Sequence, residues 1–70
     1  MNVSKLRIAR VSMGLTQTDV ASLSFNKIPQ HRVSALERGM PAKPEEAQAL
    51  SDFFGLPAAE LGVRIEEGDD

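Results

Sequence analysis

The stretch from Thr16 to Gly39 constrains the fold of this 70-residue chain most strongly, because it carries the start and stop signals of two short helices. Thr16 is a good N-cap, and Asp19 places an acid where it complements the positive end of a helix. Pro29 needs no N–H and suits the first turn of a second helix, which Gly39 can end in a left-handed conformation. The stretch therefore predicts two helices joined by a turn.

Each predicted helix has an apolar and a polar side. The apolar stripe of the first comprises Val20, Ala21 and Leu23 or Ser24. In the second, which runs over about 29–38, Val33 and Leu36 point inward, and the outward positions are Gln30, His31, Arg32 and Ala35. The segment from Phe25 to Ile28 interrupts the first stripe, and we expect Phe25 to fill the core beneath the turn rather than stand exposed. Two short helices, the second polar and basic on its outer face, form a helix-turn-helix pattern.

Further helices are predicted on both sides of this pair. The first runs from Val3 or Ser4 to Met13, and its inward face comprises Leu6, Ala9, Arg10 and Met13. After a loop with two prolines, Pro44 opens a fourth helix that Gly55 ends, and Pro57 starts a short fifth helix through Leu61 or Val63. The expected fold is all-α, with five short helices around one core in residues 1–63 and an acidic flexible tail in 64–70.

Four fragments, in the right order and near the right spacing, resemble the phage Cro/repressor-like helix-turn-helix family of small DNA-binding transcriptional regulators. They are Leu6-x-x-Ala9-Arg10-x-x-x-Gly14-Leu15-Thr16-Gln17, Val20-Ala21, Val33-x-x-Leu36-Glu37-Arg38-Gly39 and Leu50-x-x-Phe53-Phe54-Gly55-Leu56. The resemblance covers Leu6 to Val63. The distance from Gln17 to Glu37 is about two residues longer than is usual in the family, and we place the insertion in Ser24 to Lys27.

The resemblance implies a phage-repressor type of fold, with the helix at 29–38 in the major groove of double-stranded DNA. Gln17 matches a position that clamps a backbone phosphate, with a helix-capping glutamine as the alternative, and Gln30 matches the usual base-reading position. Arg10, an arginine on an apolar face, needs a partner, and the resemblance implies that Glu37 pairs with it. It also implies a homodimer whose surface comprises Leu56, Leu61 and Val63, although these residues could instead be ordinary core.

The side chains themselves indicate further contacts with DNA. Gln30 can pair bidentately with adenine, His31 can donate to guanine or phosphate, and Ala35 can lie against a thymine methyl group. The candidates for backbone phosphate contacts are Arg32, Lys43, Lys27 and Arg38, besides Gln17.

The charge distribution supports a nucleic-acid partner although the net charge is −2. Residues 1–43 contain seven basic and two acidic residues, a net charge of +5, whereas residues 44–70 contain one basic and eight acidic residues, a net charge of −7. The basic half contains the predicted helix-turn-helix, where a phosphate backbone requires positive charge.

Composition argues against other classes of function. The chain has one His, no Cys and no carboxylates clustered at metal-ligand spacing, so we expect no enzyme, no metal and no cofactor. No apolar run approaches the ~18 residues of a membrane span, and the lack of Cys fits the cytoplasm. The main alternative is a protein-interaction module on the same fold, such as an antitoxin-like or adaptor domain with a protein partner.

Overall fold

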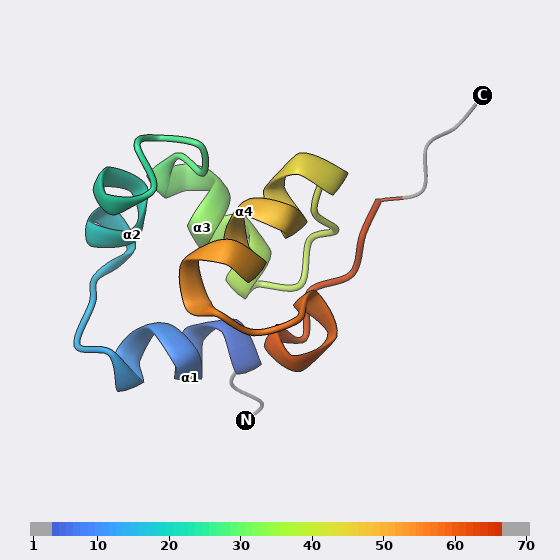
Figure 1. The fold of residues 1–70 in the computed structure, drawn as a ribbon, viewed down its shortest axis with the longest axis horizontal. Coiled ribbons are helices and arrows are strands. Elements are labelled where there is room, and N and C mark those ends of the chain that lie inside the picture. The colour runs from blue at the N-terminus through green and yellow to red at the C-terminus, as the bar shows by residue number, and fades with distance from the viewer. Residues whose placement is uncertain (1–3, 67–70) are drawn as a thin grey trace.

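The computed structural model describes residues 4–66, and within this range the chain forms four α-helices and one 3₁₀ helix (Figure 1). These elements are α1 (Lys5–Ser12), α2 (Gln17–Leu23), α3 (Gln30–Glu37), α4 (Pro44–Phe54) and η1 (Ala58–Leu61). The prediction of an all-helical fold is confirmed for this range, but the prediction of five α-helices is wrong. Between Pro57 and the left-handed Gly62, only four residues remain, which is room for a single 3₁₀ turn.

Local capping signals set the ends of the helices. The Thr16 hydroxyl accepts from the Asp19 N–H at 3.0 Å, and the Asp19 carboxylate accepts from the Thr16 N–H at 2.9 Å. The backbone N–H of Thr16, and after it the Thr16 side chain, lower the pKa of the Asp19 carboxyl by hydrogen bonding to it. At the other end of the domain, Gly55 ends α4 with a φ of 69°. The predicted N-cap at Thr16 and the helix stop at Gly55 are therefore confirmed.

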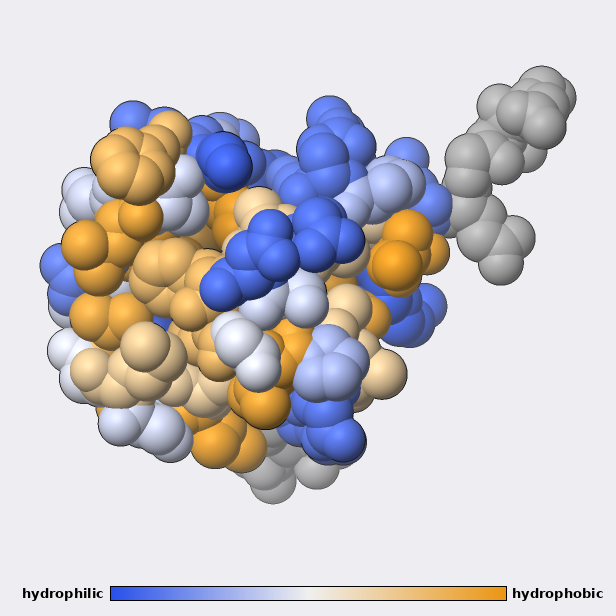
Figure 2. Space-filling model, in the orientation of Figure 1, coloured by the Kyte–Doolittle hydropathy of each residue, from blue (hydrophilic) through white to orange (hydrophobic). Residues whose placement is uncertain are grey.

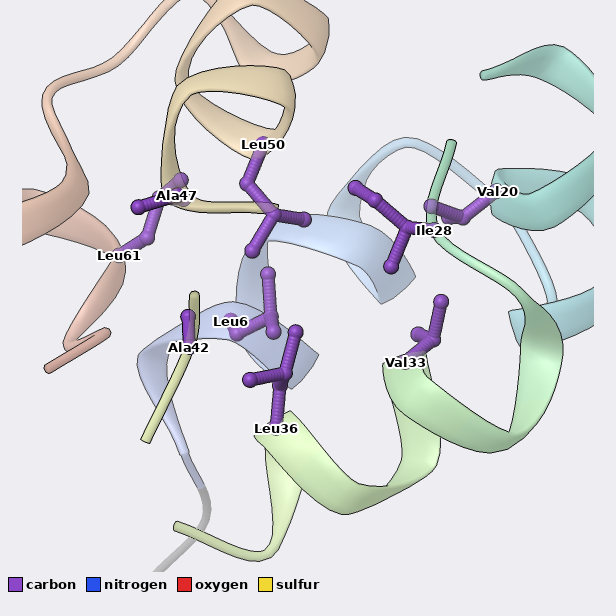
Figure 3. Close-up of a cluster of buried hydrophobic side chains, with 9 residues drawn as sticks. All are labelled: Leu6, Val20, Ile28, Val33, Leu36, Ala42, Ala47, Leu50 and Leu61. Carbon is purple, nitrogen blue, oxygen red and sulfur yellow. The ribbon is translucent and has the colours of Figure 1, made fainter. Parts of the chain in front are cut away.

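The core brings together side chains from every helix (Figure 3). Its buried members are Leu6, Val20, Ile28, Val33, Leu36, Ala42, Ala47, Leu50 and Leu61. The smaller apolar side chains Ala9 and Ala49, together with Phe53 and Phe54, pack against this cluster. Residues from the two loops, Ile28 and Ala42, are as fully buried as those of the helices, so the loops are part of the packing.

The turn between α2 and α3 corrects one prediction. Phe25, expected in the core, is 87% exposed, and Ile28 is buried in its place. Phe25 and Asn26 have φ values of 58° and 61°, and the Asn26 N–H donates to the Ala21 carbonyl at 2.8 Å. This left-handed pair of residues leaves the Phe25 ring outside and brings Ile28 inside.

The end of the described chain is tied to the loop before α4. The Ala42 N–H donates to the Arg64 carbonyl at 2.7 Å, and the Glu66 N–H donates to the Ala42 carbonyl at 2.6 Å. Ala42 and Ile65 thus form an isolated parallel bridge. The sequence assigned 64–70 to a flexible tail, yet residues 64–66 are held by these bonds, and 67–70 lie outside the described residues.

The three residues predicted to form a dimer surface differ in how far they are exposed. Leu61 is 1% exposed and belongs to the core, so its prediction as a surface residue is wrong. It is buried because η1 packs against α1 and α4. Val63 is partly buried against the same core, and Leu56 is 42% exposed.

Candidate nucleic-acid interface

A buried ion pair fixes α3 against α1. Arg10 Nε lies 2.5 Å from Glu37 Oε2, and Arg10 Nη2 donates to Glu37 Oε1 at 3.2 Å. The third donor, Nη1, bonds the Leu15 carbonyl at 2.7 Å. The two side chains are only 11% and 6% exposed. Since water reaches neither of them freely, each charge depends on the other for compensation. This pair, which the family resemblance implied, ties helix one to the end of the helix predicted to enter DNA.

A chain of amides extends from this pair to the start of α3. Gln17 Nε2 donates to Glu37 Oε1 at 3.1 Å, and Gln30 Nε2 donates to Gln17 Oε1 at 3.1 Å. Gln17 therefore connects a buried carboxylate to an exposed side chain. This bond uses one amide hydrogen of Gln30, an exposed residue, which leaves its second N–H and its carbonyl oxygen as a donor and an acceptor.

A polar hollow of about 520 Å³ lies where α1, α2 and α3 meet. It is lined by Ser4, Arg7, Arg10, Gln17, Ser34, Glu37 and Arg38. Arg7 of α1 and Arg38, the C-cap residue of α3, are exposed, and neither is in an ion pair with another residue of 4–66. The hollow is therefore cationic. Sequence reasoning named Arg38 but missed Arg7, which the helical repeat places one turn before Arg10.

The predicted contact of Arg32 with the DNA backbone is not supported by its position. Its Nε and Nη2 donate to the two Glu46 oxygens, both at 2.8 Å, and Nη2 also reaches the Pro41 carbonyl at 3.2 Å. These hydrogen bonds from Arg32 lower the pKa of Glu46. The guanidinium thus joins α3 to α4 in a bidentate ion pair, and the Arg32 side chain is only 24% exposed.

Glu46 lies in the first turn of α4, where an acid complements the positive end of the helix. It does serve the helix start, since its Oε1 accepts from the Lys43 N–H at 3.0 Å. However, the residue is buried and its main partner is Arg32. An acid of this kind has no local signature, because its partner lies 14 residues away in the chain.

The remaining predicted residues divide by exposure. Gln30 and His31 are exposed at the start of α3, and Lys27, Arg38 and Lys43 are exposed around it. Ala35, predicted to face outward, is 9% exposed and lies among the buried residues. The prediction failed because α3 is packed on more than one side, by α1 and α2 and, through Arg32, by α4.

Comparison with known proteins identifies one family. A family model described as helix-turn-helix matches residues 6–61, which is most of the chain. No curated protein and no solved structure matches this chain. None of the helices within 4–66 has the length and apolar character that a membrane crossing requires.

Proposed function

We propose that this chain, which belongs to the helix-turn-helix family, binds double-stranded DNA in a sequence-specific manner as a small transcriptional regulator. The observation that carries the proposal is the pair of exposed polar side chains at the start of α3, Gln30 and His31, of which Gln30 is held by Gln17. In this arrangement the first turn of α3 enters the major groove.

Gln30 is the principal base-reading residue in this proposal. Adenine presents an acceptor and a donor side by side in the major groove, which match the amide N–H and carbonyl oxygen that Gln30 has free. Gln17 fixes the orientation of this amide before DNA arrives, which lowers the entropy lost on binding. His31, its exposed neighbour, donates to guanine or to phosphate.

The polar hollow supplies contacts with the DNA backbone. Gln17 lies in the first turn of α2, where backbone N–H groups and the helix dipole favour a phosphate. Arg7 and Arg38 flank this position across the hollow. Lys43 and Lys27 are further exposed cations, and neither lines the hollow. Arg32 does not take part because Glu46 holds it.

In this proposal two copies read two half-sites about one helical turn apart, in the cytoplasm. A protein-interaction module remains the second candidate, and the 87% exposed Phe25 favours it, since an apolar contact requires such a side chain. Salt distinguishes the two functions, because phosphate contacts weaken steeply as salt rises and apolar contacts do not.

The test is a titration of fluorescent duplexes, followed by anisotropy between about 50 and 200 mM salt. The slope of log K against log salt should become shallower by about 0.9 for each phosphate that the protein ceases to neutralise, and so by about 2 in Arg7→Ala/Arg38→Ala. Lys5→Ala is the matched control, since Lys5 is on the same helix but lies against Gly62 and not in the hollow. Absence of binding at the lowest salt, or an equal effect of the control, would refute the proposal.

A further inference from the structure

A second hollow, apolar and of about 180 Å³, lies between the C-terminal halves of α2 and α4. It is lined by Leu23, Ser24, Phe25, Lys27, Ala49, Asp52 and Phe53. None of these residues lines the polar hollow beside α3. Figure 2 shows that apolar side chains gather on the left of this face, where α2 and the α2–α3 turn lie in Figure 1. We refer to the seven lining residues as the Phe25 surface.

The position of Phe25 is energetically unfavourable for the isolated chain. The side chain is 87% exposed, and its backbone is left-handed with a φ of 58°, a conformation that bulky L residues rarely adopt. The ring is not among the side chains that pack against the core, and Ile28 already fills the space beneath the turn. The folding of this chain alone therefore does not account for an aromatic residue at this position.

We propose that the Phe25 surface binds a second copy of this chain in a two-fold symmetric dimer, with the Phe25 ring of each copy in the hollow of the other. A two-fold interface uses the same patch on both partners, so the patch must be complementary to itself. The Phe25 surface meets this requirement in shape, because it carries both a projecting ring and an apolar hollow.

The charges on the rim are complementary to themselves as well. Lys27 and Asp52 both line the hollow, and they are exposed and form no ion pair with each other. In the proposed dimer, Lys27 of one copy pairs with Asp52 of the other, and the two-fold symmetry repeats the pair. A different protein would have to supply a ring, a hollow and both charges independently, whereas a second copy has them by symmetry.

This dimer does not depend on the proposed DNA binding, because the contact forms without DNA and the two hollows share no lining residue. Lys27 is the one residue of the Phe25 surface that is also named as a contact with the DNA backbone. The test is sedimentation equilibrium of the full chain from about 1 μM to about 1 mM, the range that covers weak dimers. Phe25→Asn suits the backbone, since Asn tolerates the left-handed region. We expect it to weaken the dimer about a hundredfold, because each substitution removes two buried rings.

Met40→Asn is the matched control, because Met40 is also an exposed apolar loop residue and lies outside the Phe25 surface. Lys27→Glu and Asp52→Lys should each weaken the dimer, and Lys27→Glu/Asp52→Lys should restore it. Far-UV circular dichroism verifies that each variant folds. A parent chain that stays monomeric at every concentration overturns the proposal. Equal dissociation constants for the Phe25→Asn and Met40→Asn dimers overturn it as well. The affinity of Phe25→Asn for a single half-site, measured separately, tests the DNA-binding proposal alone, because Phe25 belongs only to the Phe25 surface.

Discussion

Removal of the Glu37 carboxylate should be among the most damaging single changes outside the apolar core. In Glu37→Ala, Arg10 keeps only the Leu15 carbonyl as a partner while its side chain stays almost fully enclosed. Breaking a buried ion pair by removing one partner costs about 3 to 5 kcal/mol. A 70-residue domain has a free energy of unfolding of about 4 to 10 kcal/mol. The variant should therefore lose roughly half of its stability.

The measurement is urea unfolding followed by far-UV circular dichroism, because the chain has neither Trp nor Tyr to report by fluorescence. The matched control is Arg10→Met/Glu37→Leu, which replaces the pair by apolar side chains of similar length and should be nearly neutral. A loss below about 1 kcal/mol in Glu37→Ala would refute the reasoning, since that is the value of an exposed pair. An equally large loss in the double variant would mean that shape, not the unpaired charge, sets the cost.

Three further changes have distinct expected results. Glu46→Gln should cost about 2 kcal/mol at pH 7 by urea unfolding, because it removes the charge that Arg32 bonds. The pKa of Glu46 is lowered from 4.5, so its contribution is complete above pH 4.5 and is lost as the pH falls through the lower folded value; the parent and Glu46→Gln should converge in acid. Phe25→Asn should raise the free energy of unfolding of the dilute chain by about 0.5 to 1 kcal/mol, and its melting temperature with it, because it removes the backbone strain of a left-handed Phe. Gly55→Ala should lower stability by about 1 kcal/mol, since Gly55 is left-handed too, and an unchanged melting temperature would contradict this assignment of strain.

Local signals in the sequence were sufficient for the helices and their ends. Thr16, Asp19 and Gly55 act on their own neighbours, so the chemistry of a few residues determines the result. The inward positions Val33 and Leu36 follow from periodicity for the same reason. The fifth element failed because periodicity over so few residues does not separate one turn of 3₁₀ from an α-helix.

The residues that the sequence misplaced depend on packing between distant segments. Arg32 looks like an exposed base on a polar helix face, and only the docking of α4 brings Glu46 to it. Ala35 is buried because both α1 and α2 pack against α3, which the periodicity of α3 alone does not indicate. In the lengthened turn, Phe25 and Ile28 are both apolar, and no period indicates which of them enters the core.

The central claim is that the start of α3 reads DNA sequence, and selection from a random duplex pool at low and moderate salt tests it most directly. The parent chain should enrich a motif with two-fold symmetry, and Gln30→Ala/His31→Ala should lose the motif while it keeps weak, salt-sensitive binding to any duplex. Far-UV circular dichroism of the variant establishes that it folds, as expected for two exposed positions. Recovery of the same motif by the variant would contradict the claim, and so would the absence of any enriched motif with the parent.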